Sequence, residues 1–129
     1  MSLFLALAAQ VTPVPSAPPS VTPEVANEIV VIGRKIKTWK GRFIKKDGQL
    51  SCRTTKSTRD AEIDAIRCGA MITCTRPVEA EIDRLYGLTT LKRIEKERQI
   101  NALLQTTIPC MDEYFASASL ALAERRVRR

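Results

Sequence analysis

The sequence predicts an α+β fold in which a short antiparallel β-hairpin packs on three to four helices, with two disulfides joining these parts. Three observations carry this prediction. An Asp-Gly pair stands between two strand-like segments, apolar residues recur at helical spacing from Ala61 onward, and four cysteines are spread over the same region. With 129 residues, of which 44% are hydrophobic and 27% charged, the chain has the size and composition of one folded domain.

The first 27 residues are expected to lie outside that domain. Residues 1–10 resemble a signal segment, because small residues follow a short apolar run. The segment is degenerate, because no Lys or Arg precedes that run. Residues 11–27 hold five of the seven prolines and are interpreted as an extended linker, since proline fixes φ and removes a backbone donor. A single α+β domain is then expected over residues 28–129.

A β-branched run opens the expected domain. The segment Ile29-Val30-Val31-Ile32, closed by Gly33, predicts a core strand by its composition. Together with Glu28 it also resembles the energy-coupling box of TonB-dependent outer-membrane receptors, which adds a strand to its coupling protein. Ile32 stands where that box commonly has Thr, and the core strand is the interpretation we keep.

The layout of the whole chain resembles small exported cysteine-containing proteins of unknown function from Gram-negative bacteria. The shared features are a signal-like start, a proline-rich linker and a small domain with paired cysteines. The signal-like start and the four cysteines favour a periplasmic or secreted location, and the resemblance itself implies no activity.

Asp47-Gly48 predicts the two-residue loop of a hairpin with a type I′ turn, and this loop fixes the strand register. Arg42 then pairs with Arg53. Side chains alternate between the two faces of each strand. One face, expected to pack on the core, carries Trp39, Phe43, Leu50 and Cys52. The opposite, basic face carries Lys40, Arg42, Ile44, Ser51 and Arg53.

Four helical segments are expected after the hairpin. The first two run from Ala61 to Cys74 and from Val78 to Tyr86. The third runs to about Gln105 with Thr89 or Thr90 as its cap, and Thr107 and Pro109 start the last one, which ends near the C-terminal arginines. Acidic residues cluster at the start of the first two helices. We attribute them to the helix dipole rather than to paired catalytic carboxylates.

The cysteines Cys52, Cys68, Cys74 and Cys110 predict two disulfides, for which three connectivities exist. Zinc is the weaker interpretation, since the chain has no Cys-x-x-Cys pair and no histidine. Cys68 and Cys74 are separated by about 9 Å along one helix, beyond the roughly 7 Å that a disulfide spans. A comparison of strand and helix lengths favours Cys52–Cys68 with Cys74–Cys110 over Cys52–Cys74 with Cys68–Cys110.

The sequence offers no catalytic residue, cofactor motif or metal site. It lacks histidine, a Gly-rich phosphate loop and a nucleophile-elbow motif. No apolar run reaches the ~18 residues of a membrane span. Non-enzymatic binding is therefore the leading hypothesis, and a small enzyme or a thiol-redox protein using the cysteines is the alternative.

The net charge of +7 indicates what such a binding protein would bind. Residues 34–59 carry ten basic side chains and one acidic one. We expect an anionic glycan, a lipid headgroup or an acidic protein to bind the basic hairpin face. Nucleic acid is disfavoured, because export separates the protein from it and this face lacks stacking aromatics. The residues predicted to bind are Lys40, Arg42 and Arg53.

Overall fold

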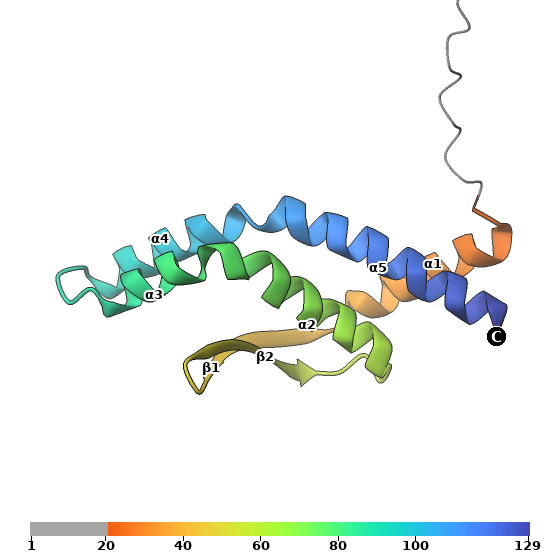
Figure 1. Ribbon diagram of the computed structural model, residues 1–129, viewed down its shortest axis with the longest axis horizontal. Coiled ribbons are helices and arrows are strands. Elements are labelled where there is room, and N and C mark those ends of the chain that lie inside the picture. Colours follow the sequence, from red (N-terminus) through yellow and green to blue (C-terminus); the bar gives the residue numbers. More distant parts are fainter. Residues whose placement is uncertain (1–20) are drawn as a thin grey trace, which may run out of the picture.

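The structure, a computed structural model, describes residues 21–129 and has the predicted α+β class. Within this range it contains five α-helices, one 3₁₀ turn and one two-stranded antiparallel sheet. Helices α4 and α5 follow one another along the molecule, α2 lies beside α5, and the hairpin packs on α2 (Figure 1). The elements are α1 (Pro23–Ile36), β1 (Lys40–Lys46), β2 (Gln49–Lys56), α2 (Ala61–Thr75), η1 (Arg76–Val78), α3 (Glu79–Gly87), α4 (Arg93–Gln105) and α5 (Ile108–Arg128).

The segment Ile29–Ile32 is helical, so the prediction of a strand there was wrong. The Thr22 side chain caps α1 by accepting a hydrogen bond from the backbone N–H of Val25, and Pro23 occupies the first turn, where its missing donor costs nothing. Tertiary burial of one helical stripe outweighs the weak helix propensity of the β-branched residues.

Helix α1 also begins before the expected domain boundary. Residues 23–27, expected to belong to the linker, form its first turns, and Val25 is buried in the core. The signal-like segment and the linker up to residue 20 lie outside the described residues.

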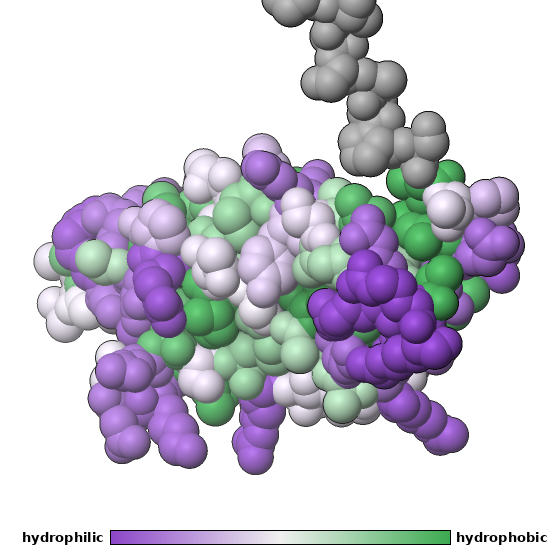
Figure 2. Space-filling view, turned by 45° about the vertical axis from the view of Figure 1, so that its right-hand side comes forward, coloured by the Kyte–Doolittle hydropathy of each residue, from purple (hydrophilic) through white to green (hydrophobic). Residues whose placement is uncertain are grey.

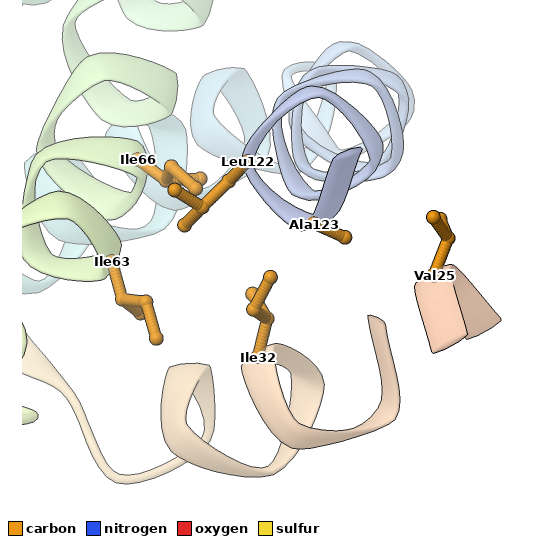
Figure 3. Packing of buried hydrophobic residues seen from close by; sticks show 6 residues of the cluster. All are labelled: Val25, Ile32, Ile63, Ile66, Leu122 and Ala123. Carbon is orange, nitrogen blue, oxygen red and sulfur yellow. The ribbon is translucent and has the colours of Figure 1, made fainter. Parts of the chain in front are cut away.

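The main core lies where α1, α2 and α5 meet. Figure 3 shows Ile32 of α1 pointing between the side chains of α2 and α5. Ile32, Ile63 and Leu122 are all fully buried. The buried cluster consists of Val25, Ile32, Ile63, Ile66, Leu122 and Ala123.

The hairpin has the predicted loop and register. Asp47 and Gly48 both have positive φ, 54° and 75°, as a type I′ turn requires. Arg42 faces Arg53, and Phe43 faces Cys52. A β-bulge at the start of β1 pairs Lys40 with Lys56.

Both disulfides have the predicted connectivity. Cys52–Cys68 joins β2 to α2, with 5.5 Å between the Cα atoms. Cys74–Cys110 joins the end of α2 to the start of α5, with a Cα–Cα distance of 5.7 Å. The second disulfide therefore joins the start of α5 to α2, the helix on which the hairpin packs.

The helices after the hairpin differ from the prediction mainly at their ends. The expected second helix is α3, which runs from Glu79 to Gly87, while Val78 belongs to the 3₁₀ turn η1 that follows α2. Helix α4 begins at Arg93, and no side chain caps it, so neither Thr89 nor Thr90 has the expected capping role. Helix α5 begins at Ile108 with Pro109 in its first turn, as expected.

An ion-pair cluster around Asp60 holds three helix ends together. The Asp60 carboxylate accepts a hydrogen bond from the backbone N–H of Ile63 and thereby caps α2. It also accepts two hydrogen bonds from Arg126 of α5, at 2.8 and 2.7 Å, and lies 3.7 Å from Lys35 Nζ of α1. In Figure 2 the strongly hydrophilic side chains gather where α5 ends.

Stability is expected to fall as the pH drops below about 4. Burial acts to raise the pKa of Asp60, but the hydrogen bonds from Arg126 and Ile63 and the charge of Lys35 outweigh it, so its pKa lies below the ordinary 3.8. The ionised Asp60 carboxylate therefore stabilises the fold at pH values above its unfolded-state pKa. This contribution is lost as the pH falls through its lower folded-state pKa. The unfolding midpoint should therefore change little between pH 7 and 5 and then decrease.

The variant Asp60→Asn tests this assignment, because asparagine can still cap α2 but cannot hold the charge. At pH 7 its unfolding midpoint should lie below that of the wild type. The difference between the two midpoints should shrink as the pH falls below 3.8 and through the lowered folded-state pKa of Asp60. Parallel curves over the whole range would assign the acid sensitivity to other carboxylates.

Candidate functional site

The predicted basic face is present on the hairpin. Arg42 and Arg53 are directly opposite each other in the antiparallel ladder, and both are exposed. Among the described residues, neither forms an ion pair with a carboxylate. Like charges placed opposite each other repel, and an anion between the two guanidinium groups would lower this electrostatic energy.

Lys40 stands apart from these two arginines. The bulge sets it opposite Lys56, and it lines a cleft of about 620 Å³ between the hairpin, α2 and the junction of α4 with α5. The structure therefore brings two of the three predicted binding residues together. The third, Lys40, lines the cleft instead.

Arg67 of α2 lines the same cleft and was not predicted from the sequence. Its guanidinium carbon lies 5.2 Å from the centroid of the Trp39 ring and 4.7 Å from that of Phe115, within range for cation–π contacts. Its Nε is buried without a hydrogen-bond partner, and within residues 21–129 no carboxylate pairs with it. Burial lowers the pKa of Arg67, yet an arginine stays charged in proteins.

The Trp39 ring that Arg67 contacts is itself fixed in place. Its Nε1 donates a hydrogen bond to Thr54 Oγ1 at 3.0 Å, and the ring packs over Gly41, where any Cβ would collide with it. Trp39 is buried, as the predicted core face requires. The Trp39 ring beside the Arg67 guanidinium is therefore held in place before any ligand binds.

A second, apolar hollow of about 380 Å³ lies between the hairpin, α3 and α4. Lys45 is among its lining residues, and its Nζ donates hydrogen bonds to Glu79 at 2.6 Å and to Asp83 at 3.0 Å. Those two bonds raise the pKa of Lys45. The apolar part of the lining includes Ile44, Leu50, Ile82, Ile100 and Leu104.

The acidic clusters noted in the sequence have structural partners. Asp60 binds Arg126, and Glu79 with Asp83 binds Lys45. In the part of the chain that the structure describes, no three His, Cys, Asp or Glu side chains are grouped as a metal site would need. All four cysteines are in disulfides.

One sequence signal could have identified Arg67. It is the only charged residue between Ala65 and Thr75, in a stretch that is otherwise apolar or small. A lone charge in an apolar helix needs a partner or a special environment. The apolar hollow had no such signal, because its walls come from segments up to about 60 residues apart.

Comparison of the chain with protein-family models, with curated proteins and with solved structures finds no match. No helix within residues 21–129 has both the length and the apolar character needed to cross a membrane.

Proposed function

We propose that the protein is a non-enzymatic binding protein that recognises an anionic partner through Arg42 and Arg53. The observation that carries this proposal is the direct cross-strand placement of two exposed guanidinium groups without a neutralising carboxylate among the described residues. Two planar guanidinium forks side by side can bind carboxylate, phosphate or sulfate groups bidentately.

The partner class follows from this chemistry and from the location that the disulfides favour. Disulfides persist in oxidising compartments, so two of them support a periplasmic or secreted protein. Acidic glycans, lipid headgroups and acidic protein surfaces are the anions such a protein meets. Nucleic acid is disfavoured, because Phe43 points to the inner side of the hairpin and the outer face has no aromatic residue for base stacking.

Replacing Arg42 and Arg53 together by glutamine is expected to weaken retention on a sulfated polysaccharide matrix, so that the variant elutes at lower salt. The variant should be as stable as the wild type or more stable by some tenths of a kcal/mol, because the substitution removes a cross-strand repulsion. Elution salt and the thermal unfolding midpoint measure the two effects.

A matched variant controls for net charge. Arg34 and Arg128 are exposed, and neither forms an ion pair within residues 21–129. Arg129 is unsuitable because it lies 3.8 Å from Glu62. The double variant Arg34→Gln/Arg128→Gln removes the same charge away from the hairpin. Equal loss of retention in both double variants would show that only net charge matters and that the hairpin face is not a site.

A further inference from the structure

The cleft at Arg67 and the apolar hollow are neighbours with a common wall. Phe43 and Leu104 line both of them. The cleft offers basic groups from Arg67 and Lys40, whereas the hollow is lined mainly by aliphatic side chains. A ligand that lies across Phe43 and Leu104 would meet positive charge at one end and hydrocarbon at the other.

We propose that the protein binds a single anionic amphiphile, with its carboxylate, phosphate or sulfate head at Arg67 and its unbranched alkyl chain in the apolar hollow. This site is separate from the Arg42–Arg53 pair of the proposed function. It concerns a monomeric ligand, not a membrane or a polymer surface.

The head is assigned to Arg67 because of the charge at each end. Arg67 has no carboxylate partner within the described residues, its Nε is buried without a hydrogen bond, and its guanidinium lies within cation–π range of the Trp39 and Phe115 rings. Lys45, in contrast, already pairs with Glu79 and Asp83, so this mouth of the hollow carries a net negative charge. The carboxylates of Glu79 and Asp83 therefore repel an anionic head near Lys45, whereas Arg67 attracts it.

The tail is assigned to the hollow because of its size and lining. A volume of about 380 Å³ falls in the range of small-molecule sites, which are mostly apolar with few polar groups. Ile100 is buried, while Leu50 and Ile82 are half-buried and present apolar surface to the hollow. An alkyl chain removes this surface from water and adds its own, which makes affinity depend on chain length.

Titration of the full chain with saturated fatty acids from hexanoate to dodecanoate, each below its micelle concentration, tests the proposal. Trp39 is the only tryptophan and lines the cleft, so its fluorescence reports occupancy, and calorimetry gives the stoichiometry. We expect one site per chain whose affinity rises about fourfold per methylene until the hollow is filled, whereas any carboxylate binding at Arg42 and Arg53 should not depend on chain length. Decanol and decyltrimethylammonium should bind at least about tenfold more weakly than decanoate, because they lack the charge-assisted bonds to Arg67.

Variants separate the two ends of the ligand. Arg67→Met keeps an unbranched side chain between the rings and should weaken decanoate at least about tenfold without changing decanol, whereas Arg34→Met should change neither. Ile82→Phe should make the affinity stop rising at a shorter chain. Arg42→Gln/Arg53→Gln should leave decanoate binding unchanged, which separates this site from the hairpin face.

Several results would overturn the proposal. An affinity independent of chain length excludes the hollow, and equal affinities for decanoate and decanol exclude the basic head site. Loss of decanoate binding in Arg42→Gln/Arg53→Gln but not in Arg67→Met would move the site to the hairpin face. The chain-length and headgroup series use the wild-type protein, so they decide the question even if Arg67→Met does not fold.

Discussion

Replacing Cys74 and Cys110 together by alanine is expected to lower the free energy of unfolding by about 4 kcal/mol. This disulfide spans 36 residues of sequence, and a cross-link over such a loop removes much of the conformational freedom of the unfolded chain. Replacing Cys52 and Cys68, which are 16 residues apart, should cost less, about 3 kcal/mol. Urea unfolding of the two paired variants beside the wild type measures both values.

The same experiment has an internal check on the state of the cysteines. Under non-reducing conditions the denatured wild type should show no free thiol, since all four cysteines are paired. Each double cysteine-to-alanine variant should keep the other disulfide and should again show no free thiol. Reactive thiols in the oxidised wild type would contradict the pairing and revive the thiol-redox alternative. A smaller loss of stability for the 74–110 pair than for the 52–68 pair would show that native-state strain outweighs loop length.

The parts of the fold that could be predicted from the sequence are those fixed by local geometry. Asp47-Gly48 determines the loop type, the loop determines the register, and the register places Cys52 within reach of Cys68. The same register places Arg42 opposite Arg53. In each step a short-range rule left few alternatives, because a slip of one residue would exchange the two faces of each strand.

The features that could not be predicted depend on contacts between distant segments. The apolar hollow exists only because the hairpin, α3 and α4 come together, and Arg67 has its aromatic neighbours only because Trp39 and Phe115 approach from opposite ends of the chain. Residues 29–32 have the composition of a strand, and burial against α2 and α5 makes them helical. Tertiary packing decided each of these cases.

Replacing Ile32 by alanine is expected to lower the free energy of unfolding by about 2–5 kcal/mol, because a fully buried side chain is removed and a cavity remains. Val30→Ala should be neutral or stabilising by some tenths of a kcal/mol, because Val30 is 52% exposed and alanine is the better helix former. Denaturant unfolding of the two variants gives the two values.

The sign of the Val30 effect separates the helix from the strand that composition suggests. In a core strand, Val30 and Ile32 would lie on the same face, and truncating either side chain would be destabilising, since valine is the better strand former. In helix α1 they point in different directions, and only Ile32 reaches the cluster formed with Ile63 and Leu122. Val31→Ala should behave like Val30→Ala, because Val31 is also exposed. Similar large losses for Val30→Ala and Ile32→Ala would contradict the helix and restore the strand.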